Sequence, residues 1–128
     1  MSASTLIALS LATVLFNQLS RAFADGDRAL RHVVQVLQAM AEPGDWLVRL
    51  GGEEFVLVLE QPAGTAWERL DAMRRMLCER PFEHDRGAGG RSRLTFSAGI
   101  AASPHDGRDL SRLLRRANER LRIAKNEG

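Results

Sequence analysis

The stretch WLVRLGGEEFVLVLE, residues 46–60, gives the clearest structural signal in the chain. Its two apolar runs, 46–50 and 55–60, are rich in the β-branched and aromatic residues that favour strands. The glycine pair Gly51-Gly52 between them suits a tight turn, because glycine readily adopts the backbone angles that such turns require. The stretch therefore predicts a β-hairpin with two acidic residues at its tip.

The segments on either side of the hairpin alternate between strand and helix patterns. Residues 5–12 are continuously apolar, which is typical of a central strand covered by helices. Apolar residues recur at helical spacing over 30–40, 66–77 and 110–124, and LTFSAGIA at 94–101 indicates another strand. The order β-α-β-β-α-β-α predicts an α/β (α+β) domain of the ferredoxin-like or polymerase-palm kind. We expect a central, mainly antiparallel sheet of about four to five strands with helices on one face.

Turn-forming residues separate these elements. Asp25-Gly26-Asp27 predicts a turn and an N-cap, Pro43-Gly44 ends the first helical pattern, and 104–107 predicts another turn. The glycines of 87–90 indicate a flexible loop. Gly99 lies inside a strand pattern, which predicts a close approach of a backbone or a ligand.

Composition limits the class of protein. A chain of 128 residues and 14.2 kDa fits a single domain, here 1–128, and 45% hydrophobic residues can form a core. The single cysteine, Cys78, excludes a disulfide framework and a cysteine-rich zinc site. A formal net charge of only +2 gives little support for nucleic-acid binding. Aromatic residues at 5%, with no tyrosine, argue against a stacking platform for single strands.

The N-terminal region has two interpretations. The apolar run 6–16 and the small residues of Ala22-Phe23-Ala24 outline a secretory signal peptide. No lysine or arginine precedes the run, however, and it is shorter than the ~20 residues of a membrane span. We favour the interpretation as a buried strand of a cytoplasmic domain, with the signal peptide as the alternative.

The hairpin tip is the candidate site of chemistry. Glu53 and Glu54 adjoin glycines that let a ligand approach the backbone. Mg²⁺ is commonly bound by one or two carboxylates together with substrate phosphates, so this pair suits a magnesium site. From the spacing alone, two solvated glutamates are the favoured interpretation.

These residues resemble a known family. The segment Arg49–Phe55 and the apolar strand after it are similar to the signature hairpin of the GGDEF family, the diguanylate cyclase domains, in the variant with Glu at the third position. Further segments match in order: Gly26-Asp27 with Leu30 resembles G-D-x-x-L of the first long helix, 95–101 resembles the next strand, and 113–119 and 124–128 resemble the C-terminal helix, which reads L-L-x-x-A-D and ends A-K-x-x-G-R. The resemblance covers nearly the whole chain and implies a nucleotidyl-cyclase palm.

The resemblance also implies an activity. GGDEF domains condense two GTP molecules into cyclic di-GMP and two pyrophosphates, and each domain of a dimer presents one GTP. The 3′-hydroxyl of one GTP attacks the α-phosphate of the other, with Mg²⁺ as the cofactor. The implied partners are GTP, a second copy of the domain, and a sensor or phosphodiesterase domain in trans or in a longer chain. A specific nucleic acid and a membrane span are not expected.

The resemblance assigns functional roles to the hairpin residues that match the family's motif. By this resemblance Glu53 is a metal ligand and assists deprotonation, and Glu54 is a second acid at the metal. Gly51 and Gly52 let GTP lie against the turn, and Arg49 helps with phosphate charge.

The other implied contacts lie outside the hairpin. Asp27 accepts hydrogen bonds from the guanine edge, Asn17 takes the place of a guanine-reading asparagine, and Lys125 holds the terminal phosphates. An N-cap role for Asp27 and a solvated helix-end cation for Lys125 are the structural alternatives.

The first strand departs from the family pattern D-[IL]-D-x-F-K, whose first Asp is a metal ligand. An ungapped alignment places Ser10 there, and an alignment on Phe16 places Ala12 there. No Asp or Glu precedes Asp25. Loss of a charge-assisted contact costs ~1.5–3 kcal/mol, so we expect a weakened Mg²⁺ site.

Three functions follow from this departure. The first is an impaired or degenerate cyclase domain that acts as a GTP-binding or regulatory, dimerising module. The alternatives are an active diguanylate cyclase and an unrelated palm-like nucleic-acid-binding domain.

Two further differences concern regulation and length. The R-x-x-D motif that binds the inhibitory product in many members is here Glu42-Pro43-Gly44-Asp45, which predicts no product inhibition at that site. The leading D-x-L-T-G-L-x-N-R segment of the family is not found before the first strand.

Overall fold

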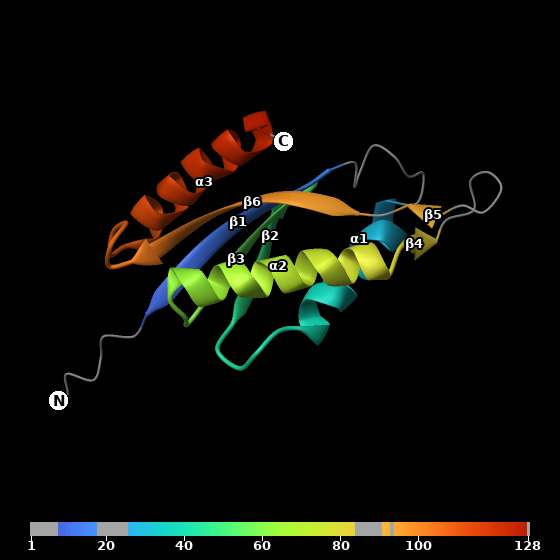
Figure 1. Cartoon of the computed structure of the whole chain (residues 1–128), viewed down its shortest axis with the longest axis horizontal. Coiled ribbons are helices and arrows are strands. Elements are labelled where there is room, and N and C mark those ends of the chain that lie inside the picture. Colours follow the sequence, from blue (N-terminus) through green and yellow to red (C-terminus); the bar gives the residue numbers. More distant parts are fainter. Residues whose placement is uncertain (1–7, 18–25, 84–90, 93, 128) are drawn as a thin grey trace.

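A four-stranded antiparallel sheet forms the centre of the molecule (Figure 1). The computed structural model describes residues 8–17, 26–83, 91–92 and 94–127. The sheet has the order β2-β3-β1-β6, with the bounds β1 Leu9–Asn17, β2 Trp46–Gly51, β3 Glu54–Leu59 and β6 Thr95–Ser103. The helices are α1 Gly26–Ala39, α2 Ala63–Glu79 and α3 Leu110–Glu127. The predicted class, an α+β domain with a central antiparallel sheet, is confirmed.

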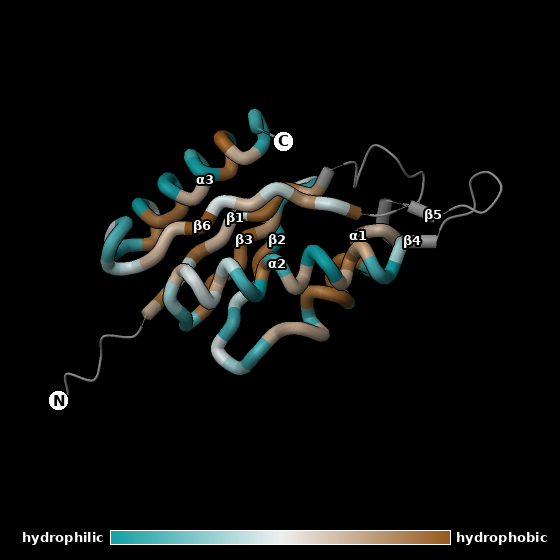
Figure 2. Tube along the Cα trace, in the orientation of Figure 1, coloured by the Kyte–Doolittle hydropathy of each residue, from teal (hydrophilic) through white to brown (hydrophobic). Residues whose placement is uncertain are grey.

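The sheet has helices on both faces, so the expectation that all helices share one face is wrong for α3. Side chains of α1 and α2 pack on one face around the buried Ala12, Val14 and Phe16 of β1. On the other face, Leu11 of β1 packs with Leu113 and other side chains of α3. The reason is that β1 is apolar along both of its faces, and each apolar face must be covered. Figure 2 shows hydrophobic residues concentrated in the strands between these layers.

Strand β1 begins and ends later than the sequence indicates. The prediction placed it at 5–12, whereas the structure has Leu9–Asn17 between β3 and β6. Most of the apolar run that could also be a signal peptide is therefore the central strand. Ala22-Phe23-Ala24 and the loop 87–90 lie outside the described residues. In the described part of the chain, no helix combines the length and the apolar character of a membrane span.

A pair of short strands was not predicted. β4, Phe82–Glu83, and β5, Arg91–Ser92, form a separate two-stranded sheet. Two residues are too few to produce a periodic pattern, so the sequence held no signal for them.

Gly99 is the point where α3 lies closest to the sheet. A Cβ atom at Gly99 would lie 2.0 Å from the carbonyl oxygen of Ala117 and 2.4 Å from the amide nitrogen of Leu121. The predicted close approach at this glycine is therefore made by the backbone of α3.

Candidate active site

The turn between β2 and β3 forms an open elbow, which we define as Gly51, Gly52 and Glu53. Gly52 has a φ of +25°, a backbone conformation that favours glycine. Nη2 of Arg49 donates a hydrogen bond to the carbonyl oxygen of Gly52 at 3.1 Å, which ties the start of the turn to its tip. Glu53 and Glu54 are both half-buried. The sequence thus predicted both the hairpin and the acidic position of its tip.

The glycines leave room for a ligand against the backbone. A Cβ atom built on Gly51 or on Gly52 would meet no atom within 4 Å. Packing therefore does not require glycine at either position, and the space beside the elbow is open. This is the property expected of a turn against which a phosphate or nucleotide lies.

The elbow is joined to the end of β1. The amide nitrogen of Phe16 donates a hydrogen bond to the carbonyl oxygen of Glu53 at 2.9 Å. In the ladder between β1 and β3, Leu15 lies opposite Glu54. The end of the first strand and the acidic tip of the hairpin are therefore neighbours, as the sequence interpretation required.

Aromatic packing supports the elbow from the core side. The ring of Phe16 packs edge-on against Phe55 and Phe96, with centroid distances of 5.5 and 5.3 Å. Phe16 and Phe55 are fully buried. Such pairs add about 0.5–1.5 kcal/mol beyond their buried area, so the strand ends at the elbow are firmly held.

The same register corrects the placement of Ser10 and Ala12. Ser10 lies opposite Leu59, and its hydroxyl donates a hydrogen bond to the carbonyl oxygen of Gln61 at 2.6 Å. Ala12 lies opposite Leu57 and is fully buried. Since a strand rises about 3.3 Å per residue, Ser10 is about 17 Å along β1 from Leu15. Neither residue lies beside the elbow, so the expectation that either occupies a metal-ligand position is wrong.

The remaining predicted residues are placed by their elements. Asn17 ends β1 opposite Thr95, and Asp27 is the second residue of α1, which begins one residue before it. Asp27 is therefore inside the helix, and the predicted N-cap role does not fit the helix start. The side chains of Asn17 and Asp27 lie outside the described part of the structure.

Lys125 is exposed in the last turn of α3. Because α3 follows β6 and runs back along it, this turn lies toward the end of the sheet at which β6 begins and β1 ends (Figure 1). Lys125 is thus at the elbow's end of the molecule.

The acidic residues at the elbow meet the minimum for a hard cation. Glu53 and Glu54 supply two carboxylates beside open space, and Mg²⁺ often takes no more protein ligands than this. Opposite them on β1 are Phe16 and Leu15, which have no donor side chain. Within the described ranges, no cluster of three or more His, Cys, Asp or Glu residues forms a metal site.

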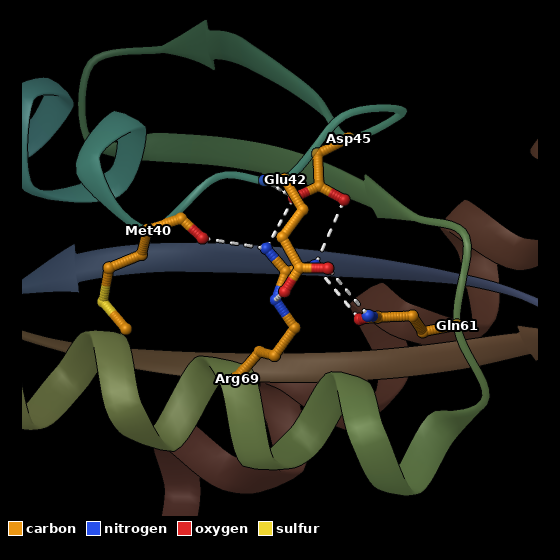
Figure 3. Close-up of polar contacts among 5 residues, drawn as sticks. All are labelled: Met40, Glu42, Asp45, Gln61 and Arg69. Atoms are coloured by element: carbon orange, nitrogen blue, oxygen red, sulfur yellow. Dashed lines mark hydrogen bonds and ion pairs between the residues drawn. The ribbon is translucent and has the colours of Figure 1, made fainter.

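A second polar network, missed by the sequence analysis, joins α2 to the α1–β2 turn (Figure 3). The guanidinium of Arg69 donates to both carboxylate oxygens of Asp45 and, at 3.1 Å, to the carbonyl oxygen of Met40. The Asp45 and Arg69 side chains are each only 11% exposed. Glu42 lies within 3.5 Å of the Arg69 guanidinium and accepts a hydrogen bond from Gln61. Residues so distant in sequence carry no local pattern that could have indicated this contact.

The charge state of Asp45 follows from this network. Burial raises the pKa of the Asp45 carboxyl, but the hydrogen bonds from Arg69 and from the Glu42 amide, together with the positive charge of Arg69, outweigh burial and lower the pKa below its ordinary value. Asp45 is the residue kept from the R-x-x-D pattern. In this chain its carboxylate is already engaged by an internal arginine.

One groove among the described residues lies elsewhere. It has a volume of about 420 Å³ and runs along β6 beside α2, lined by Trp67, Phe96, Ile100 and their neighbours. None of the predicted site residues lines it. The candidate site therefore rests on the elbow and not on this groove.

Comparison with known proteins identifies the chain. The family model described as "Diguanylate cyclase, GGDEF domain" matches residues 4–128. The chain belongs to the GGDEF family. This membership removes the alternative of an unrelated palm-like domain.

Curated GGDEF relatives are much longer than this chain. A diguanylate cyclase of Vibrio cholerae is 28% identical over 104 residues, which are 80% of this chain and 31% of that protein. Diguanylate cyclase DgcM of Escherichia coli is 33% identical over 105 residues, 80% of this chain and 24% of that protein. The chain therefore spans about a quarter to a third of these relatives.

Solved GGDEF structures share the fold. The GGDEF domain of YfiN from Pseudomonas aeruginosa superposes with a TM-score of 0.85, covers 98% of this chain and 80% of that one, and is 21% identical. The active GGEEF domain of a diguanylate cyclase from Vibrio cholerae gives a TM-score of 0.82 at 23% identity, over 95% of this chain and 79% of that one.

Proposed function

We propose that this GGDEF domain binds GTP at the elbow and acts in cytoplasmic cyclic di-GMP signalling as a GTP-binding or regulatory, dimerising module with impaired cyclase activity. The observation that carries the proposal is the register of β1 on β3. It sets Leu15 and Phe16 opposite Glu54 and Glu53, so the strand beside the elbow offers no carboxylate.

The elbow and its surroundings suit a triphosphate. Gly51 and Gly52 leave the backbone open, and Arg49 is exposed beside them. Lys125 adds a second cation at this end of the molecule. We assign Arg49 and Lys125 to phosphate charge, and Asn17 and Asp27 to the guanine by their resemblance to the family.

Glu53 and Glu54 would hold Mg²⁺. When bound, this ion neutralises phosphate oxygens and lowers the pKa of a hydroxyl nucleophile. With only the two hairpin acids, the site has one charged ligand fewer than the family pattern. A contact of this kind is worth ~1.5–3 kcal/mol, about a 10–150-fold effect on binding or rate.

Product inhibition through the R-x-x-D position is not expected. Glu42 replaces the arginine, and an acid repels the product's phosphates. Asp45 is held by Arg69, so its carboxylate is not available to a ligand without breaking that pair.

An active diguanylate cyclase is the second candidate. It is supported by the names of the curated relatives, several of which are diguanylate cyclases, and by the likeness to a GGEEF domain described as active. The two candidates share GTP binding and differ only in turnover.

The test is incubation of the protein with GTP and Mg²⁺, with chromatography of the products and calorimetry on the same sample. We expect GTP to bind in the micromolar range with little or no cyclic di-GMP formed, and Glu53→Ala to abolish any turnover found. Rapid product formation would establish the active enzyme. Absence of GTP binding would refute the proposal.

A further inference from the structure

Strand β2 has an irregularity directly before the elbow. Arg49 lies opposite Phe55 and Gly51 lies opposite Glu54, so Leu50 is an extra residue in the ladder between β2 and β3, a β-bulge. Bulges are common beside functional sites, where they change the direction of the strand and of the side chains that follow. The bulge at Leu50 therefore sets the direction in which β2 enters the elbow.

Side-chain packing does not hold the β2 side of the elbow. The side chain of Leu50 is 51% exposed, and a Cβ atom at Gly51 or Gly52 would meet nothing within 4 Å. On the β3 side, by contrast, the ring of Phe55 is buried against Phe16. The conformation of the β2 side therefore depends on polar contacts.

Arg49 supplies such a contact. Its Nη2 atom donates a hydrogen bond to the carbonyl oxygen of Gly52 at 3.1 Å, which spans the bulge and closes the loop 49–52. The guanidinium is planar and carries its donors in a fixed arrangement, so the bond defines the direction of this carbonyl group. Arg49 thereby acts on the backbone of the elbow as well as placing a charge beside it.

Two hydrogen bonds hold the backbone on either side of Glu53. The Gly52 carbonyl that accepts from Arg49 and the amide nitrogen of Glu53 belong to one planar peptide group. The next peptide group begins at the Glu53 carbonyl, which accepts from the Phe16 amide at 2.9 Å. Because both peptide groups are held, the φ and ψ angles of Glu53 are restricted, and so is the direction in which its side chain leaves the backbone.

This direction matters at a magnesium site. Mg²⁺ requires nearly ideal octahedral geometry with oxygens at about 2.0–2.1 Å, so a displaced carboxylate is a poor ligand. The positive charge of Arg49 by itself opposes a cation at Glu53. Charge alone therefore cannot increase the gain in GTP affinity that Mg²⁺ provides, whereas the geometry that Arg49 gives to Glu53 can.

We propose that Arg49 is a positioning residue for Glu53: its hydrogen bond to the Gly52 carbonyl fixes the elbow so that the Glu53 carboxylate faces the cation of the GTP site. This role is additional to the attraction of phosphate charge, and its part that concerns the cation rests on the proposed function. The effect on the elbow itself can be measured without any ligand.

The first test follows amide hydrogen exchange by NMR in Arg49→Ala without ligand. Loss of the Arg49 bond frees the peptide group before Glu53, so the bond from the Phe16 amide to the Glu53 carbonyl should open more often. We expect exchange at the Phe16 amide to be about two- to tenfold faster, the value of one hydrogen bond. Exchange at the Ala12 amide, in the middle of the same strand, should stay unchanged.

The second test separates positioning from phosphate charge. GTP affinity is measured by calorimetry with and without Mg²⁺, and the ratio of the two affinities is the Mg²⁺ gain. Removal of a residue that only attracts phosphate lowers both affinities alike and does not reduce the Mg²⁺ gain. We expect Arg49→Ala to reduce the Mg²⁺ gain by about two- to tenfold.

Two further variants are the controls. Arg49→Lys keeps the charge but replaces the planar guanidinium by a flexible ammonium, so it should recover the affinity without Mg²⁺ and not the Mg²⁺ gain. Arg75→Ala removes the same kind of side chain from α2, which carries no part of the elbow, and should change neither the exchange rates nor the Mg²⁺ gain. Circular dichroism shows whether each variant is folded.

The outcomes distinguish this inference from the proposed function. Unchanged exchange at Phe16 in Arg49→Ala, or equally faster exchange at Phe16 and Ala12, would overturn the hold of Arg49 on the elbow. An unchanged Mg²⁺ gain in Arg49→Ala, or its full recovery in Arg49→Lys, would assign Arg49 to charge alone. Absence of GTP binding by the parent chain would refute the proposed function, and hydrogen exchange would still decide whether Arg49 holds the elbow.

Discussion

The amide of Phe16 and the carbonyl of Glu53 are hydrogen-bonded at 2.9 Å, which fixes the end of the first strand against the hairpin tip. This bond sets the register of β1 on β3. It also decides which residue is available to complete a cation site. The residue opposite Glu54 is Leu15, so a further carboxylate can be introduced beside the hairpin acids at one defined position.

We predict that Leu15→Asp strengthens Mg²⁺-dependent GTP binding by about tenfold or more, the size expected of a charge-assisted contact. The new carboxylate would lie across the ladder from Glu54. Calorimetric titration with GTP in the presence and absence of Mg²⁺ measures the effect. Leu15→Asn is the uncharged control, and a gain equal to that of Leu15→Asp would show that charge is not the cause.

Ala12→Asp should behave differently. This position is fully buried among apolar side chains, so a carboxylate there destabilises the fold and brings no gain in binding. Thermal unfolding distinguishes the two variants. An increase in GTP affinity with Ala12→Asp would contradict the register described above.

Arg69→Ala should lower the free energy of unfolding by about 2–3 kcal/mol. It leaves the nearly buried Asp45 carboxylate without its partner and removes the donor to the Met40 carbonyl. The matched control is Arg75→Ala, whose side chain is 69% exposed beside Asp71, so its removal should change the free energy of unfolding far less. Urea unfolding of both variants is the measurement, and equal losses would refute the distinction.

Stability should fall in acid as Asp106 is protonated. Both carboxylate oxygens of Asp106 accept hydrogen bonds from the Arg120 guanidinium, and one of them also accepts a hydrogen bond from the Ala102 amide. The hydrogen bonding to Arg120 is the main reason that the pKa of Asp106 falls to about 2. A carboxyl with a lower pKa when folded stabilises the protein above its unfolded pKa of about 3.9, and this contribution is lost as pH falls toward 2.

Urea unfolding at pH 6, 4 and 2.5 tests this pH dependence. Asp106→Asn should be less stable than the parent at pH 6 and should lose less stability on acidification. A variant with the same acid sensitivity as the parent would assign the effect to other carboxyls, of which Asp45 is the first candidate because its pKa is also lowered.

Two buried hydroxyls should respond in opposite ways to removal. Oγ1 of Thr13 is buried and has no hydrogen-bond partner in the described structure, so Thr13→Val should leave stability unchanged or raise it by about 1 kcal/mol. Ser10→Ala removes the donor to the Gln61 carbonyl and should cost about 1 kcal/mol. Thermal unfolding compares the two. A loss in both variants would mean that Thr13 has a partner.

The sequence predicted the hairpin, the helices and the family, because each has a strong local signal. The apolar runs on both sides of Gly51-Gly52 placed β2 and β3 to within one residue. The first strand was misplaced because an unbroken apolar run gives no mark of where a strand begins or ends. The two alignments with the family's first-strand pattern placed the expected cation ligand at Ser10 or Ala12, whereas the register sets Leu15 opposite Glu54. The sheet face on which α3 packs and the Arg69–Asp45 ion pair both depend on tertiary packing, so no local sequence pattern indicates them.

The three phenylalanine rings behind the elbow have a mechanical consequence. Phe16 of β1 and Phe55 of β3 lie beside the tip, and the ring of Phe16 contacts both Phe55 and the half-buried Phe96 of β6. Any displacement of the tip would have to separate these rings, so the hairpin should be rigid. A nucleotide would then fit an already formed surface, and its affinity would reflect the residues present there and little reorganisation of the chain.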